Sequence, residues 1–310
     1  MLVQLITRWI GLSMDADNGL AWRSVVVLRR AMPTNKVFLD YTQAELDQAY
    51  DQLVWAPHRD AIQAEIRKDC EAVRQKMPPR TERYGRSEKQ ELDIFAPPNA
   101  TKVPVLVYLH GGAWLRGSRL DTIYPAPAVT GRGAALVVPE FNNVSEVPLP
   151  AMVQQCREAV DWTVRNAASF GGDPERVYLA GHSSGAHLAS CVLLSDPPVK
   201  GALLISGMYD LYAPLLSARS KYVKITPEEL DAASAMRHLG RIRCPVAVAW
   251  SVGDSPEFRR QGRVLSAALE GMGRLASGTE VLTPNHFEEP RQLADPDSAL
   301  SAVLHSLMKI

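Results

Sequence analysis

Short, nearly continuous apolar runs recur along the chain, separated by longer segments of mixed polarity. The runs are VPVLVYLH (103–110), AALVVP (134–139), RVYLAG (176–181), GALLISG (201–207) and CPVAVAW (244–250). Their length and their content of Val, Leu and Ile are typical of strands that are buried on both faces of a sheet. An earlier segment, QELDIFAP (90–97), alternates between polar and apolar residues, which predicts a strand at a sheet edge.

Helical patterns lie between these runs. Apolar residues recur at the spacing of one helix face over 151–168, 186–194, 257–272 and 297–308. Strands that alternate with helices favour right-handed crossovers, and therefore a mostly parallel central sheet flanked by helices. The pattern thus predicts an α/β fold, in which ligands bind at the carboxyl ends of the strands.

The segment before this region has a different pattern. Residues 40–77 predict two helical pieces broken at Ala56-Pro57, and Thr42 and Glu45 have the spacing of a capping box. The segment is too small to form a core alone, so we expect it to cover the part that follows. We therefore divide the chain into an N-terminal extension of unknown role (1–37), a helical cap segment (38–80) and an α/β domain (81–310), with Met14 and Met32 as alternative natural starts.

Charge and hydropathy limit the kinds of partner that the chain is expected to bind. The 310 residues include 34 Lys and Arg and 34 Asp and Glu, so no net field draws the chain to nucleic acid or to an anionic membrane. No run approaches the roughly 20 apolar residues that a membrane span needs. The amino terminus lacks a basic leading region and a small-residue cleavage site, which disfavours a secretory signal. We expect a small neutral or amphipathic partner, and the oligomeric state stays open, with a homodimer among the alternatives.

The cysteines indicate the compartment. They are Cys70, Cys156, Cys191 and Cys244, and they form no C-x-x-C pair and have no histidine at a ligand spacing, which disfavours structural zinc. Cys156 and Cys191 fall within apolar helical patterns, which favours buried, reduced thiols and a cytoplasmic protein. The spacing alone does not exclude a disulfide.

The sequence GHSSG (181–185) directly follows a predicted strand and precedes a predicted helix. In a G-x-S-x-G elbow the central serine, here Ser183, sits on a sharp, strained turn above the sheet. The Ser184 amide then lies at the helix N-terminus, where an oxyanion would form. The alternative is a serine-rich helix cap, since serine is a favoured N-cap residue. The motif alone leaves both interpretations open.

A second motif, HGGAW (110–114), ends the strand at 103–109. Consecutive glycines allow backbone N–H groups to converge on one point, so Gly111 and Gly112 are candidate oxyanion donors, and His110 is expected to anchor the loop. A plain Gly-Gly turn is the alternative. Its position before the elbow favours an acyl-transfer enzyme.

An acid and a base follow later strands. Asp254 lies in SVGDSPEFRRQ (251–261), and His286 lies in NHFEE (285–289). Serine is a poor nucleophile at neutral pH and needs an imidazole base, which a carboxylate orients. The order Ser183, Asp254, His286 is the one expected for an α/β-hydrolase. Asp210 and Glu257 are the competing acids, while the histidines without a strand-end context are His58, His187, His238 and His305.

Taken together, these motifs resemble α/β-hydrolases, and more narrowly the kynurenine formamidase (arylformamidase) group and its esterase relatives. The resemblance runs from about residue 38 to the carboxyl terminus and depends on DYTQAELDQAYD (40–51), HGGAW, FGGDPERVYLAGHSSGAHLA (170–189), SGMYDL (206–211), GDSPEFRRQ (253–261) and NHF (285–287). It implies a triad of Ser183, Asp254 and His286 and an oxyanion hole from Gly111, Gly112 and Ser184. The chain departs from the family at PEFNN (139–143), where a tyrosine-containing segment is common.

The resulting hypothesis is a serine hydrolase that works through an acyl-enzyme and requires no metal or organic cofactor. The expected substrate is a small carboxylic ester or an aryl amide such as an N-formyl anilide. Four aromatic residues are placed to line its pocket or, equally, to belong to the core: Trp114, Phe141, Tyr209 and Tyr212. The alternatives are a thioesterase or a tailoring hydrolase of a biosynthetic pathway, and a non-catalytic binding protein with a hydrolase-like fold.

Overall fold

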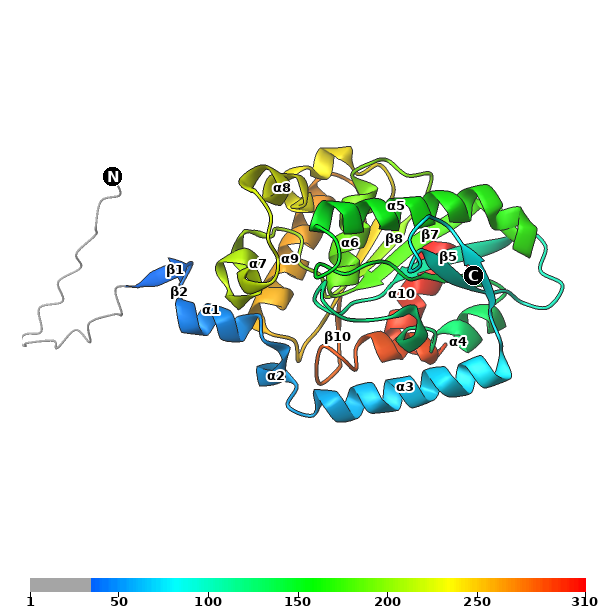
Figure 1. Cartoon of the computed structure of the whole chain (residues 1–310), viewed down its shortest axis with the longest axis horizontal. Coiled ribbons are helices and arrows are strands. Elements are labelled where there is room, and N and C mark those ends of the chain that lie inside the picture. Colours follow the sequence, from blue (N-terminus) through cyan, green and yellow to red (C-terminus); the bar gives the residue numbers. More distant parts are fainter. Residues whose placement is uncertain (1–34) are drawn as a thin grey trace, which may run out of the picture. The chain divides into compact units, whose positions relative to one another are not determined.

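An eight-stranded sheet forms the centre of the protein in the computed structural model, which describes residues 35–310 (Figure 1). Its strands are β3 (Arg80–Arg83), β4 (Glu91–Phe95), β5 (Val103–Leu109), β6 (Ala135–Pro139), β7 (Gly172–His182), β8 (Ala202–Ile205), β9 (Val246–Ser251) and β10 (Leu275–Val281). They lie in the order β10-β9-β8-β7-β5-β6-β4-β3. The six strands β5 to β10 run parallel to one another, while β4 is antiparallel to β6 and β3 is antiparallel to β4. The predicted mostly parallel sheet is therefore confirmed.

The expectation that residues 90–97 form an edge strand is wrong. β4 pairs with β6 on one side and with β3 on the other, so β3 is the edge. The polar residue in the alternation, Asp93, is fully buried because it bonds Arg74 of α3 at 2.8 Å and Thr81 of β3 at 2.7 Å. The strand β3 escapes prediction because its sequence, RTER, is entirely polar, as suits an exposed edge.

Helices cover both faces of the sheet (Figure 1). One face carries α5 (Leu149–Asn166), α6 (Ser184–Leu193) and α9 (Pro256–Gly271), and the other carries α3 (Arg59–Lys76), α4 (Ala126–Gly131) and α10 (Ala299–Met308). The four helices predicted from the apolar spacing correspond to α5, α6, α9 and α10 within a few residues. The shorter turns are 3-10 helices at η1 (Arg119–Asp121), η2 (Ala167–Phe170), η3 (Ala218–Lys221), η4 (Ala235–Arg237), η5 (Leu239–Arg241) and η6 (Pro290–Ala294).

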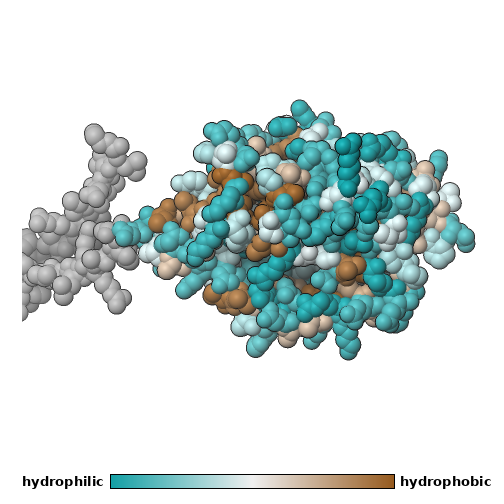
Figure 2. Space-filling model, in the orientation of Figure 1, coloured by the Kyte–Doolittle hydropathy of each residue, from teal (hydrophilic) through white to brown (hydrophobic). Residues whose placement is uncertain are grey.

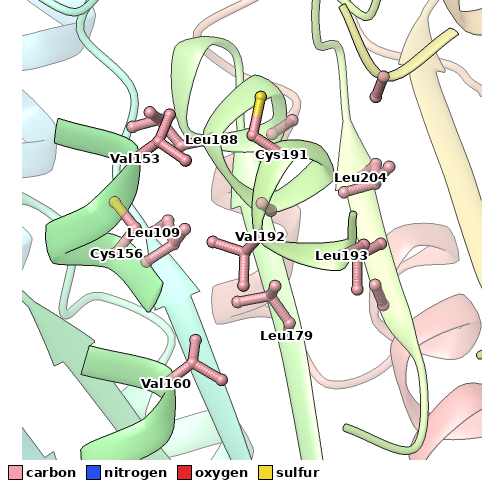
Figure 3. Close-up of a cluster of buried hydrophobic side chains, with 14 of the residues drawn as sticks. Leu109, Val153, Cys156, Val160, Leu179, Leu188, Cys191, Val192, Leu193 and Leu204 are labelled. Atoms are coloured by element: carbon pink, nitrogen blue, oxygen red, sulfur yellow. The ribbon is translucent and has the colours of Figure 1, made fainter. Parts of the chain in front are cut away.

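The core beneath α5 and α6 fixes the position of β7. Val153, Cys156 and Val160 of α5 meet Leu188 and Val192 of α6 above the sheet (Figure 3). These side chains are almost completely buried. Because α6 begins directly after β7, this packing holds the turn between them in place.

The cap segment contains α1 (Gln43–Ala49), α2 (Gln52–Trp55) and α3, and it begins with a small antiparallel pair of β1 (Lys36–Phe38) and β2 (Tyr41–Thr42). The capping box of Thr42 and Glu45 is confirmed, and the break at Ala56-Pro57 separates α2 from α3. A further break at Tyr50-Asp51, which the pattern did not predict, separates α1 from α2. Of the predicted N-terminal extension, residues 1–34 lie outside the described part of the chain.

Two further observations concern the described residues. None of their helices has the length and apolar character needed to cross a membrane. Their surface is mostly hydrophilic in the view of Figure 2, with apolar residues near β1 and α7 (Tyr212–Leu216). In that region Phe38 and Tyr212 pack ring against ring at 6.2 Å. The remaining short helix, α8 (Pro227–Ala232), follows η3.

Candidate active site

Ser183 lies at the turn between β7 and α6 with φ 57° and ψ −123°, a conformation that non-glycine residues rarely adopt. Holding a serine there costs about 1–3 kcal/mol, which the packing around it must offset. Both flanking glycines are required by space. A Cβ on Gly181 would lie 2.4 Å from the Gly185 carbonyl oxygen, and a Cβ on Gly185 would lie 2.2 Å from the Leu109 carbonyl oxygen. This geometry is the one expected of a nucleophile elbow, and it is not that of an ordinary serine helix cap, since Ser183 makes no side-chain capping bond.

The topology brings the two glycine motifs together. The chain passes from β5 to β6 on one side of β5 and then through α5 to β7 on the other side. The carboxyl ends of β5 and β7 therefore flank the point at which the strand order reverses, where open α/β sheets bind ligands. A Cβ on Gly111, after β5, would lie 3.2 Å from the Ser183 Cβ, so the HGG loop is directly beside the elbow.

His286 and Asp254 form a buried pair. The two residues follow β10 and β9, and His286 Nδ1 lies 2.7 Å from Asp254 Oδ2. The two side chains are 2 % and 0 % exposed. Because a carboxylate accepts, Nδ1 carries the hydrogen, which leaves Nε2 as the nitrogen able to take a proton. This is the tautomer that a general base beside a serine requires.

The Asp254 carboxylate is held by two further donors. Its Oδ1 accepts from the Ser255 backbone N–H at 2.7 Å and from Gln52 Nε2 at 3.1 Å. Gln52 belongs to α2 of the cap segment, and it escaped prediction because nothing in its local sequence indicates a partner so distant in the chain. The cap therefore contacts the candidate acid directly.

Ser183 and His286 line one cavity of about 590 Å³. Gly111, Gly112 and residues of α1, α2 and α3 line it too, so the cap segment borders the candidate site. Among the described residues no hydrogen bond joins the Ser183 hydroxyl to His286. In enzymes without a bound substrate such contacts are often long and shorten when the substrate binds.

Aromatic rings enclose the candidate base. The His286 ring lies 4.8 Å from Phe258, 5.4 Å from Phe287 and 4.5 Å from His182, measured between ring centroids. Burial, followed by the neighbouring His286, holds the pKa of His182 well below its usual value. His182 is therefore neutral and does not add a second positive charge beside the base.

The HGG loop is anchored by His110. Its Nε2 lies 3.0 Å from Glu140 Oε1, and its Nδ1 lies 2.9 Å from the Gly111 carbonyl oxygen. Both partners are oxygen acceptors, so these contacts hold the ring between the loop and β6. Burial alone would raise the pKa of Glu140, but its bonds to His110, Ser118 and the Arg119 N–H lower that pKa to about 2. The expected anchoring role of His110 has this acidic partner, which the sequence did not indicate.

The four aromatic residues expected to line the pocket are not among the residues around this cavity, and that expectation is corrected. Trp114 is fully buried, and its Nε1 donates a hydrogen bond to His187 Nδ1 at 3.0 Å. Phe141 stacks on the His110 ring at 4.1 Å, and the buried Tyr209 hydroxyl accepts from the Gly207 N–H at 3.1 Å. Tyr212 is 48 % exposed and packs on Phe38.

The competing acids are engaged elsewhere. Asp210 forms an ion pair with Arg237 at 3.2 Å, and Glu257 binds Arg260 at 2.7 Å and accepts from the Tyr50 hydroxyl at 2.9 Å. His187 donates from Nε2 to the Ala233 carbonyl at 2.9 Å, and burial lowers its pKa to about 4, so it is a neutral structural residue. Among residues 35–310, no cluster of His, Cys, Asp and Glu side chains is arranged to hold a metal ion.

The fold and these residues define the class of protein, which is an α/β-hydrolase. Residues 92–199 match the protein family described as BD-FAE. Kynurenine formamidase of Danio rerio is 33% identical over 234 residues, which cover 71% of this chain and 78% of that protein. Kynurenine formamidase of Salmo salar is 29% identical over 295 residues, covering 87% of this chain and 97% of that protein.

The chain belongs to the kynurenine formamidase family and has hydrolase activity of the esterase and arylformamidase type. Among solved structures, a suggested thioesterase from Silicibacter superposes with a TM-score of 0.74 at 25% identity. The match covers 84% of this chain and 98% of the other. These comparisons confirm the predicted fold and the predicted class of reaction.

Proposed function

We propose that this enzyme hydrolyses small esters or N-formyl aryl amides through an acyl-enzyme formed on Ser183. His286 removes the proton from the Ser183 hydroxyl as the oxygen attacks the carbonyl carbon, and Asp254 orients the imidazole. The same imidazole then protonates the leaving amine or alcohol. In the second half, His286 activates a water that attacks the acyl carbon, and Ser183 leaves as the free hydroxyl.

The observation that carries this proposal is the buried Asp254–His286 pair, whose histidine lines the same cavity as a serine with φ 57°. A structural serine has no need of that strained conformation, and a surface histidine has no need of a buried carboxylate. Backbone N–H groups of Gly111, Gly112 and Ser184 are the proposed oxyanion donors. They lie beside the elbow and at the N-terminus of α6, where the helix dipole also favours negative charge.

The proposed substrate class follows the relatives. Both curated proteins are named kynurenine formamidases, which favours an N-formyl aryl amide over a long-chain lipid ester. The cap segment borders the cavity and restricts its volume to about 590 Å³, a size suited to one small molecule. A cytoplasmic location fits the four cysteines of the described part, all of which are free thiols.

The first experiment tests the nucleophile. A fluorophosphonate probe is expected to label the wild-type protein and to leave Ser183→Ala unlabelled, with turnover of p-nitrophenyl acetate lost in that variant. Ser184→Ala is the matched control, because it removes a neighbouring hydroxyl and leaves the backbone N–H in place, so it should keep most of the activity. An unlabelled wild type would contradict the proposal and favour a binding protein, and equal labelling of Ser183→Ala would contradict Ser183 as the nucleophile.

The second experiment tests the substrate. We expect kcat/KM to be highest for one of two groups of substrates, the formyl amides (N-formylkynurenine and simple formyl anilides) or the short p-nitrophenyl esters. Among the p-nitrophenyl esters it should fall as the acyl chain lengthens. A preference for long acyl chains would contradict the capped cavity. Inactivity on every formyl amide would remove the formamidase assignment.

A thioester substrate is the second candidate, because the superposed Silicibacter protein is a suggested thioesterase. The same triad would serve, since a thioester carbonyl is attacked in the same way and its thiolate leaves more readily. Comparing acetyl-CoA with an oxygen ester of the same acyl group distinguishes the two. A kcat/KM at least tenfold higher for the thioester would favour this candidate.

A further inference from the structure

Arg219, on η3, is a buried cation in the wall of the candidate active site. Arg219 is only 6 % exposed, and it lines the same cavity as Ser183 and His286. Among residues 35–310 no carboxylate lies within 4.0 Å of its guanidinium. Since buried charges in proteins are normally paired, an unpaired guanidinium at a ligand cavity indicates that the ligand supplies the anion.

Two acidic residues that contact the neighbours of Arg219 have other partners. Asp47 of α1 accepts from the Ala218 N–H at 2.7 Å, next to Arg219 in the chain, but makes no ion pair with it. Glu257 binds Arg260 through both oxygens, at 2.7 and 2.8 Å. Neither therefore neutralises the Arg219 guanidinium by direct contact.

Three aromatic rings hold the guanidinium. Its central carbon lies 5.9 Å from the centroid of Tyr50, 5.7 Å from that of Trp114 and 5.9 Å from that of Phe258. Ring faces attract a guanidinium without using up its N–H groups. The rings thus fix the side chain in position and leave its edges free for hydrogen bonds.

The hydrogen bonds of Arg219 account for only part of its donors. A guanidinium has five N–H groups. In the described residues, Nη1 donates to the Tyr222 hydroxyl at 3.1 Å and Nη2 donates to the Tyr50 carbonyl at 2.9 Å. Nε is buried and has no partner there. Donors therefore remain for a carboxylate, which arginine binds through two parallel hydrogen bonds.

Arg219 is also close to the reacting groups. The Phe258 ring lies near both groups, because its centroid is 5.9 Å from the central carbon of the guanidinium and 4.8 Å from the centroid of the His286 ring. Ser183, His286 and Arg219 also line one cavity, so a single small substrate can contact all three.

We infer that Arg219 binds a carboxylate of the substrate, so that the enzyme prefers esters or formyl amides with a carboxylate a few bonds from the scissile carbonyl. This inference rests on the proposed function and adds a specificity-determining residue to it. Two substrate pairs distinguish a carboxylate on the acyl group from a carboxylate on the leaving group.

The first pair is mono(p-nitrophenyl) glutarate and p-nitrophenyl pentanoate, which differ by a carboxylate on the acyl group. The second is N-formylkynurenine and its methyl ester, which differ by a carboxylate on the leaving group. For at least one pair we expect the anionic member to have the higher kcat/KM. Arg219→Gln should reduce that preference about 10- to 100-fold, mainly through KM, because one charged hydrogen-bonded contact is lost.

Two variants control the interpretation. Arg219→Lys keeps the charge and should retain part of the preference. Arg67→Gln removes an exposed arginine of the same cavity and should leave the preference unchanged. A substrate preference in Arg219→Gln equal to that of the wild type would overturn the inference, while retained hydrolysis of the neutral esters would leave the proposed function standing.

A measurement on the wild type covers the case in which Arg219→Gln does not fold. 4-Phenylbutyrate should inhibit hydrolysis of p-nitrophenyl acetate at least tenfold more strongly than 4-phenylbutanamide, which has the same shape and no charge. Equal or stronger inhibition by the amide would overturn the inference.

Discussion

At the scale of single residues, the HGG loop depends on one buried carboxylate, Glu140. Glu140 accepts from His110, Ser118 and two backbone N–H groups, and its pKa is lowered to about 2. Folding lowers the pKa of this carboxylate, so it stabilises the protein when the pH is above its pKa in the unfolded chain, which is 4.5. That stabilisation is lost as the pH falls towards the folded-state pKa of about 2. The shift corresponds to about 3 kcal/mol at neutral pH.

We therefore expect Glu140→Gln to lower the free energy of unfolding by about 3 kcal/mol at pH 7, since it leaves the buried His110 without its anion. Urea unfolding between pH 3 and pH 7 measures this. The wild type should lose stability more steeply than the variant as the pH falls below 4.5, so the two curves converge in acid. Parallel curves over that range would contradict a stabilising role for the ionised Glu140.

At the scale of elements, the sequence predicts the helices and strands whose apolar residues recur at a regular spacing. The buried strands and the amphipathic helices were found from their apolar spacing, whereas β3 was missed because all four of its residues are polar. The GHSSG motif predicts the sharp turn at Ser183 without such spacing, because close backbone contacts around this turn require Gly181 and Gly185. Gln52, Glu140 and Arg219 were missed because their roles depend on partners that only the folded chain brings near.

Helix α2 illustrates such a role. Gln52 lies 202 positions from Asp254 and supplies one of the two donors to Asp254 Oδ1. Without it the carboxylate is held on that side only by the Ser255 N–H, and the His286 ring is less well oriented. We expect Gln52→Ala to lower kcat about 10-fold with little change in KM, because the contact is to the candidate acid and not to the substrate.

Steady-state kinetics on p-nitrophenyl acetate test this expectation. Gln48→Ala is the matched control, since this exposed glutamine of α1 makes no side-chain hydrogen bond among the described residues. Gln52→Glu should be worse than Gln52→Ala, because it places a second carboxylate against Asp254. An unchanged kcat in Gln52→Ala would indicate that α2 covers the site without positioning the acid.

At the scale of the whole molecule, buried hydrogen bonds beside the candidate active site join the cap segment to the α/β domain. The Tyr50 hydroxyl donates to Glu257 at 2.9 Å and accepts from Gln261 at 3.1 Å, and the Ser255 hydroxyl donates to the Ala49 carbonyl at 2.6 Å. These groups are buried, so breaking their bonds exposes the loop that carries Asp254. The cap should therefore unfold together with the α/β domain and not before it.

Tyr50→Phe tests this coupling, because it removes one hydroxyl and leaves Glu257 and Gln261 each short of a partner. We expect a loss of about 1–3 kcal/mol in the free energy of unfolding, with activity and circular dichroism still lost in one transition. Tyr212→Phe, at a half-exposed ring with no hydroxyl bond among residues 35–310, should change stability by no more than about 0.5 kcal/mol. If activity disappeared at a lower denaturant concentration than the helical signal, the cap would be a separately unfolding unit, and its contacts with Asp254 and Glu257 would not couple it to the sheet.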